Sequence, residues 1–154
     1  MVIPREWMAS ALASRQSDKE IDFRNCISRA YYAAYHAALL VADEHFPDSD
    51  SPQHRGSHQH LINRFRSSAY RPAKRLAKAL KNMKLKRCRA DYQVDETVTL
   101  AEADEALADA VRIQALLEAC VPSRQLSDGE AFAPVGYRAD HALAARPAEP
   151  AATQ

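Results

Sequence analysis

The chain has 154 residues, enough to bury one hydrophobic core, and its 21 Lys and Arg nearly balance its 20 Asp and Glu. No apolar run approaches the roughly 20 residues of a membrane span, and the N-terminus lacks the charged and apolar blocks of a signal peptide. The three cysteines form no CxxC pair, which favours reduced thiols. We therefore expect a cytoplasmic protein with no membrane association, with Cys26 and Cys120 in its core.

Helical spacing of the apolar residues and the presence of only three glycines predict an all-α fold. A short, peripheral helix is expected over residues 4–14, with Pro4 in its first turn. Ser17 and Glu20 have the spacing of a capping box, so a long helix is expected over residues 18–45. Phe23, Ala30 and Val41 belong to its apolar stripe.

The second half of the chain continues the helical pattern. A loop rich in Pro, Ser and Asp over residues 46–52 precedes a helix over residues 56–68 and a basic amphipathic helix over residues 72–89. Thr99 and Glu102 form a second capping box, which begins a last helix that ends before Pro122. Residues 1–121 should therefore form a bundle of four to five helices, followed by a disordered, Ala- and Pro-rich tail over residues 122–154.

The near-zero net charge hides a strong segregation of charge. Residues 51–90 contain no Asp or Glu but hold 12 of the 21 basic residues, which leaves 9 basic and all 20 acidic residues elsewhere. A basic face that is merely solvated would be the simplest interpretation. The positive charges of a run this long without a carboxylate repel one another unless a partner offsets them. A polyanion such as RNA is therefore favoured as the partner.

The sequence SRAYYAAYHAA at residues 28–38 combines several chemical groups on the long helix. Arg29, Tyr32 and His36 recur at three and four residues, which places a cation, a phenol and an imidazole on one side of the helix. The alanines between them allow another helix to approach closely. This stretch is therefore both a packing centre and a candidate site.

A second polar stretch, RCRADY at residues 87–92, ends the basic helix. Asp91 is the first acidic residue after the carboxylate-free run, so it could pair specifically with Arg29. The alternative is a structural ion pair, with Tyr92 covering the core.

These two motifs are about sixty residues apart. Together with the helix start at Ser57 and His58, they resemble the HEPN superfamily, in particular its small stand-alone members. The resemblance covers residues 18–120. It implies a helical bundle that is often a homodimer, from a superfamily found in toxin–antitoxin, antiphage and CRISPR-linked systems. Many members are metal-independent ribonucleases, and others bind nucleotides or act as non-catalytic partners.

The ribonuclease signature of that superfamily is an Arg followed after four to six residues by His. Arg87 matches the arginine, but Cys88 stands where Asn is common, and Asp91 and Tyr92 occupy the place of the His. Two other pairs have a similar spacing, Arg29 with His36 and Arg55 with His60. The candidate catalytic residues are Arg29, His36, Arg87 and Asp91.

The remaining candidates would bind RNA, and they come from the basic helix and its surroundings: Lys74, Lys78, Lys81, Arg89, Tyr32 and His58. His54, His58 and His60 lack a nearby Cys or carboxylate that could complete a metal site, and no cofactor is expected. We expect an RNA-binding HEPN-type domain, either a metal-independent endoribonuclease of the toxin or defence type or a non-catalytic partner. The partner in the second case would be an antitoxin, a nucleotidyltransferase or a nucleotide.

Overall fold

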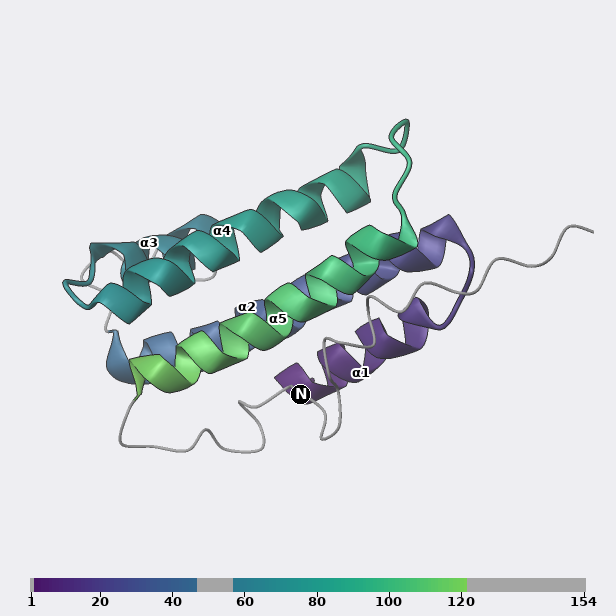
Figure 1. Ribbon diagram of the computed structural model, residues 1–154. Helices are drawn as coiled ribbons and strands as arrows, with labels where there is room; N and C mark the ends of the chain where they lie inside the picture. Colours follow the sequence, from purple (N-terminus) through teal and green to yellow (C-terminus); the bar gives the residue numbers. More distant parts are fainter. Residues whose placement is uncertain (1, 47–56, 122–154) are drawn as a thin grey trace, which may run out of the picture.

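The computed structural model describes residues 2–46 and 57–121, which form five α-helices and no strand in those ranges. The helices are α1 (Pro4–Arg15), α2 (Glu20–His45), α3 (His58–Ser67), α4 (Arg71–Tyr92) and α5 (Leu100–Cys120). They pack into one bundle, so the expected all-α fold is confirmed (Figure 1). Within the described ranges, no helix combines the length and the apolar character that a bilayer crossing requires. The predicted tail, residues 122–154, lies outside the described residues.

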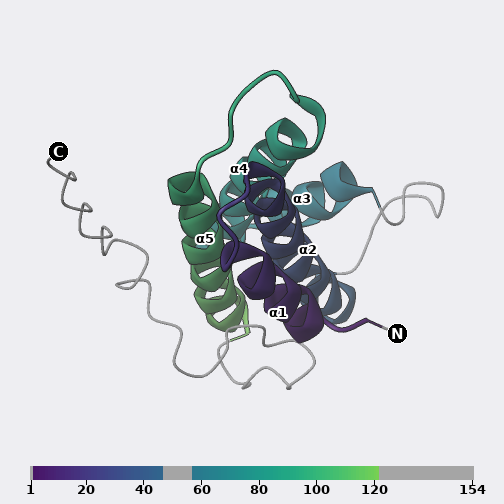
Figure 2. The ribbon, with the colours of Figure 1, turned by 90° about the vertical axis from the view of Figure 1, so that its right-hand side faces the viewer.

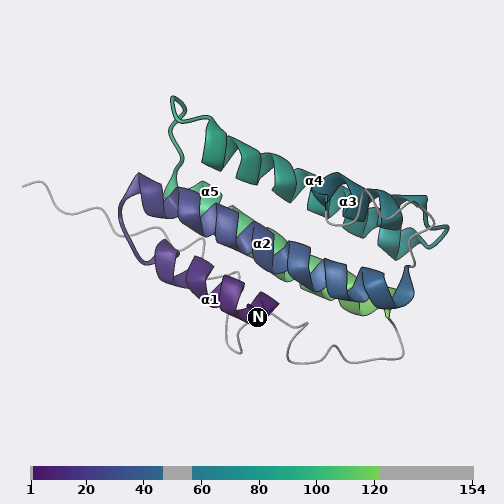
Figure 3. The same ribbon diagram turned by 180° about the vertical axis from the view of Figure 1, so that it is seen from behind.

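Helix α2 lies at the centre of the bundle and contacts all four other helices. Seen along its axis, α1, α5, α4 and α3 surround it (Figure 2). From behind, α1 and α2 lie side by side over the length of α1 (Figure 3). This arrangement gives α2 a long buried surface on several sides.

Small side chains explain how α2 can be enclosed. Ala30, Ala33, Ala34, Ala37 and Ala38 are all fully buried, and alanine lets the backbones of neighbouring helices approach closely. The larger apolar side chains come mainly from the surrounding helices, among them Met8, Leu76, Leu80, Leu107, Ile113 and Leu117. Burial of each such side chain contributes about 1.5–3 kcal/mol to folding. Cys26 and Cys120 are buried in this core, as expected.

Helix α1 packs more intimately than a peripheral helix would. Met8 and Ala11 are fully buried, and the Trp7 ring lies against side chains of α2. The expectation of a peripheral first helix was therefore wrong.

The two expected capping boxes have different outcomes. The Thr99 hydroxyl accepts from the Glu102 backbone N–H, and the Glu102 carboxylate accepts from the Thr99 backbone N–H, so this box is confirmed. The box at Ser17 is wrong, because α2 begins at Glu20 and Ser17 accepts only from the Lys19 backbone N–H. The Glu20 carboxylate instead accepts from the Val98 backbone N–H at 3.0 Å.

The buried Arg24 side chain holds the connection between α4 and α5 against the first turn of α2. Its guanidinium donates to the carbonyl oxygens of Ala90 at 2.8 Å, Gln93 at 3.2 Å and Glu96. It also donates to the Glu20 carboxylate at 2.7 Å. These bonds supply a donor to the carbonyl groups of Ala90 and Glu96, whereas the Gln93 carbonyl also accepts from the Glu96 backbone N–H.

Candidate functional site

Arg87 occupies a core position of α4. It follows Leu80 and Met83 and precedes Ala90 on the apolar face of the helix, and only 6% of its surface is exposed. A buried arginine normally has several close hydrogen-bond partners, because leaving a charged donor unpaired costs free energy. The surroundings of Arg87 depart from that rule.

Three tyrosine rings enclose the Arg87 guanidinium. Its central carbon lies 5.5 Å from the centre of the Tyr31 ring, 5.6 Å from Tyr32 and 5.7 Å from Tyr92. At these distances, close to the limit of about 6 Å, each cation–π contact contributes about 0.5–1 kcal/mol. The rings therefore stabilise the charge without using its N–H groups.

The polar contacts of Arg87 are all long. One Nη lies 3.3 Å from the Tyr92 hydroxyl and 3.5 Å from the Asp91 carboxylate, and the other lies 3.4 Å from His58 Nε2. The buried Nε has no hydrogen-bond partner in the described part of the chain. A guanidinium with weak contacts and an unpaired donor retains capacity to bind an oxyanion.

His58 begins α3, which Ser57 caps by accepting from the His60 backbone N–H. The His58 ring is half-buried, with its centre 4.4 Å from that of Tyr35, and its Nδ1 lies 2.7 Å from the Tyr31 hydroxyl. Because Arg87 can only donate, Nε2 is the unprotonated nitrogen and Nδ1 carries the hydrogen. Burial, and next the positive charge of Arg87, lower the pKa of His58 below its usual 6.5. A neutral imidazole whose unprotonated Nε2 makes only the 3.4 Å contact with Arg87 can act as a base at neutral pH. We call Arg87, His58, Tyr31, Tyr32 and Tyr92 the Arg87 centre.

A second group of side chains adjoins this centre. Trp7 of α1 lies against three residues of α2: the Arg29 guanidinium is 5.1 Å from its ring centre, Tyr32 is 5.2 Å away, and His36 stacks on it at 5.9 Å. Burial lowers the pKa of His36. The structure thus brings Arg29, Tyr32 and His36 together, as their spacing predicts, and adds Trp7. We call these four residues the Trp7 strip, which meets the Arg87 centre at Tyr32.

Asp91 does not pair with Arg29. Its carboxylate lies 3.5 Å from Arg87 and accepts from the Ser28 hydroxyl at 3.4 Å, while Arg29 lies over Trp7. The expected pairing with Arg29 was wrong, because Trp7 of α1 occupies the position beside the Arg29 guanidinium. Tyr92 is 71% exposed, so it does not cover the core either.

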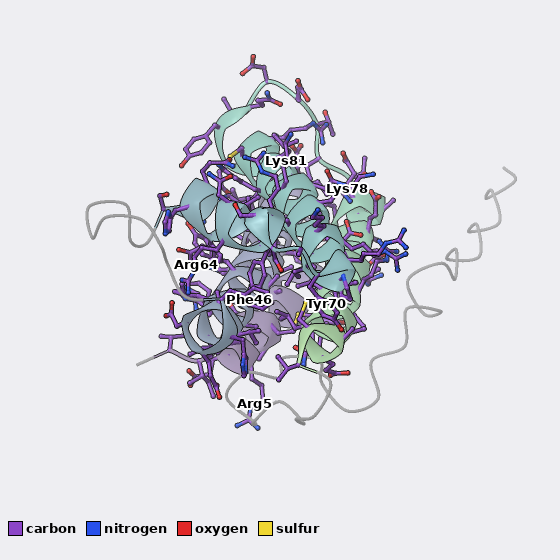
Figure 4. The ribbon with its side chains drawn as sticks, turned by 90° about the vertical axis from the view of Figure 1, so that its left-hand side faces the viewer. Arg5, Phe46, Arg64, Tyr70, Lys78 and Lys81 are labelled. Carbon is purple, nitrogen blue, oxygen red and sulfur yellow. The ribbon has the colours of Figure 1, made fainter. Side chains whose placement is uncertain are left out.

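The basic residues of α4 fall into two classes. Lys74, Lys78 and Lys81 are exposed, and Lys78 and Lys81 project from the outer surface of α4 (Figure 4). Lys86 and Arg89 are instead neutralised by carboxylates: Lys86 by Glu105 and Asp109, and Arg89 by Glu96 and Glu102. The predicted role of Arg89 in RNA binding therefore has less support than that of the three exposed lysines.

Arg55 and His54 lie outside the described residues, so the structure places neither the pair of Arg55 with His60 nor a histidine cluster. Among residues 2–46 and 57–121, no group of three or more His, Cys, Asp and Glu side chains is arranged to hold a metal ion.

The sequence interpretation missed the contact between His58 and Arg87, which are 29 positions apart, and it missed Trp7, Tyr31 and Tyr35. One signal could have found Arg87. A charged residue at an apolar position of an amphipathic helix is expensive to bury, which indicates a function or a network.

No protein-family model, curated protein or solved structure matches this chain. The resemblance to the HEPN superfamily stays a prediction from its two motifs. The geometry of the Arg87 centre is therefore the main indication of function.

Proposed function

We propose that this chain is an RNA-binding domain of HEPN type that cleaves RNA at the Arg87 centre by a metal-independent reaction. The observation that carries the proposal is a buried arginine with an unpartnered Nε beside a neutral histidine. A phosphate group has the charge and geometry to use the Nη donors of Arg87, whose contacts within the protein are long. The adjacent imidazole can then accept a proton.

In the proposed reaction, His58 Nε2 takes the proton of a ribose 2′-OH. The 2′ oxygen forms a bond to the adjacent phosphorus, and the bond to the 5′ oxygen of the next nucleotide breaks. The products are a 2′,3′-cyclic phosphate and a 5′-hydroxyl, whose proton comes from a general acid or from water. Arg87 stabilises the additional negative charge on the phosphate oxygens as the 2′ oxygen attacks.

The tyrosine at the Nδ1 side of His58 supports this assignment of roles. The Tyr31 hydroxyl lies 2.7 Å from Nδ1 and can accept from Nδ1–H, which fits the tautomer with an unprotonated Nε2. Burial raises the pKa of Tyr31 well above its usual 10, so the phenol stays neutral. Tyr31 is therefore a positioning residue for His58.

The exposed ring beside the Arg87 centre and the outer surface of α4 both suit a single-stranded RNA. The 71% exposed Tyr92 ring offers a surface on which a base can stack, and stacking contributes about 1–3 kcal/mol per base. The exposed Lys74, Lys78 and Lys81 can each displace a counterion from the backbone, so affinity should fall steeply with salt.

Cleavage and binding can be tested together on a short labelled RNA at low salt, with a chelator present. His58→Gln should bind RNA within about threefold of the unchanged protein but should lose cleavage, because a base contributes little to ground-state affinity. Arg87→Gln should lose both binding and cleavage. His36→Gln tests the histidine among the candidate catalytic residues from the sequence, and it should keep cleavage if His58 is the base.

Two matched substitutions serve as controls. His45→Gln changes the exposed imidazole at the end of α2, and Arg5→Gln removes an exposed guanidinium of α1. Both should bind and cleave as the unchanged protein does. Cleavage by His58→Gln at the unchanged rate would refute the assigned base, and an unchanged protein that neither binds nor cuts RNA would refute the proposed function.

An exposed apolar surface supports a second candidate function, the binding of a protein partner. Leu85, Tyr92 and Val94 are 58%, 71% and 77% exposed at the end of α4 and in the following turn. Large exposed apolar side chains at one place favour an interface, either with a second copy of this chain or with an antitoxin or nucleotidyltransferase protein. Light scattering at high micromolar concentration would distinguish a homodimer from a monomer awaiting a partner.

A further inference from the structure

A groove runs between α4 and α5, with a cavity volume of about 320 Å³. Its polar lining comes from Arg75, Lys78 and Asn82 on α4 and from Asp109 and Arg112 on α5. The volume lies at the lower end of the range for small-ligand sites. Three cations and one carboxylate therefore face a space that a small ligand can enter.

Both oxygens of the one carboxylate in the groove are already paired with cations other than Arg75 and Lys78. Asp109 accepts from Arg112 at 2.5 Å through Oδ1 and from Lys86 at 2.6 Å through Oδ2. Arg75 and Lys78 make no hydrogen bond or ion pair with any residue in the ranges 2–46 and 57–121. The groove thus carries uncompensated positive charge, although an acid lies within it.

We propose that this groove is a second phosphate site, which binds a phosphate group of a nucleotide or of an RNA strand. Arg75 and Lys78 would hold the phosphate oxygens from one side, and Arg112, which Asp109 keeps in place, would approach them from the other. Arginine and lysine side chains that converge on one space are the usual protein ligands of phosphate.

The floor of the groove favours an organic phosphate over a free ion. Ala79 and Leu116 line it, and neither offers a hydrogen bond. An apolar floor can accommodate a sugar or base, and it reduces the screening of the charges above it. The Asn82 amide at the same wall can donate to or accept from such a group.

The groove is separate from the Arg87 centre. Arg87 follows Asn82 by five residues, which places the two side chains about 140° apart around the axis of α4. The site does not depend on the proposed cleavage reaction, so the two can fail independently. An RNA strand could reach both sites only by crossing the exposed surface of α4.

Titration with pyrophosphate at low salt tests the site directly. The chemical shifts of the arginine side-chain Nε–Hε groups report the binding. The double variant Arg75→Gln with Lys78→Gln should weaken pyrophosphate binding at least about tenfold, because two of the three cations are removed. A matched double variant, Arg71→Gln with Lys84→Gln, removes the same charge from positions of α4 that do not line the groove. It should weaken binding about twofold or less.

Two outcomes would overturn the proposal. Equal weakening by both double variants would mean that pyrophosphate responds to the general charge of α4, and a titration without saturation would mean that no site exists. Leu116→Glu adds a carboxylate to the floor and should abolish binding without removing a cation. Competition identifies the source of the phosphate. Displacement of pyrophosphate by a short RNA favours a strand, and displacement by a nucleoside diphosphate alone favours a free nucleotide. Displacement by neither contradicts the proposed ligand class.

Discussion

Arg87 and Arg24 are both more than nine-tenths buried, yet their surroundings predict opposite results when each is replaced by methionine. Methionine keeps much of the apolar volume of the arginine side chain but supplies no donor and no charge. A structural arginine should therefore be costly to replace, whereas an arginine retained for ligand binding should not.

The contacts of each arginine determine how much its replacement should change the free energy of unfolding. Arg24→Met removes the donor to the carbonyl groups of Ala90 and Glu96 and leaves Glu20 without its cation, which should lower the free energy of unfolding by about 3–5 kcal/mol. Arg87→Met loses three cation–π contacts of about 0.5–1 kcal/mol each, but it also removes a buried, unpaired Nε whose desolvation costs about 1–3 kcal/mol. The two terms for Arg87 nearly cancel, so its variant should stay within about 1 kcal/mol of the unchanged protein.

Urea unfolding followed by circular dichroism measures both variants, and RNA binding is measured on the same samples. We expect Arg87→Met to fold with nearly unchanged stability while it loses RNA binding. Arg24→Met should show a clearly lower urea midpoint. A loss of stability in Arg87→Met as large as that in Arg24→Met would show that Arg87 is a structural residue, which would refute the reasoning behind the candidate site.

Three further predictions concern single groups. Because the pKa of His58 is lowered in the folded state, the unfolded chain binds protons first as pH falls below 6.5. The free energy of unfolding should therefore decrease below pH 6.5, and it should decrease less in His58→Gln. Urea unfolding at a series of pH values measures this dependence. Thr99→Ala should lower stability by about 1 kcal/mol through loss of a helix cap, whereas Ser17→Ala should have a much smaller effect in the same assay. Burial raises the pKa of Cys26 to about 12. A thiol reagent at neutral pH should therefore modify the partly exposed Cys88 first and Cys26 only after unfolding. Mass spectrometry of the labelled peptides determines this order.

The fold could be predicted from the sequence where local chemistry determines structure. The Thr99 box forms because its two partners are three residues apart, and Glu102 keeps one carboxylate oxygen for Thr99 while the other accepts from Arg89. The Ser17 box fails because Glu20 finds partners elsewhere, the Arg24 guanidinium and a backbone N–H 78 residues away. Local signals cannot anticipate such distant competition.

The candidate site shows the same limit. Spacing along one helix placed Arg29, Tyr32 and His36 together, since residues three and four apart share a face. It could not place His58 beside Arg87, because that contact depends on how α3 crosses α4. A search for Arg and His within one helix therefore finds the Trp7 strip and misses the pair in which the histidine comes from another helix.

Trp7 is the single tryptophan of the chain, and its ring stacks on His36 and touches the Arg29 guanidinium. An excited indole readily transfers an electron to a protonated imidazole, so its emission depends on the charge of the ring beside it. The intrinsic fluorescence of the protein is thus a local signal from the surface next to the Arg87 centre. An event that moves Tyr32 or protonates His36 becomes visible in the native chain without any attached label.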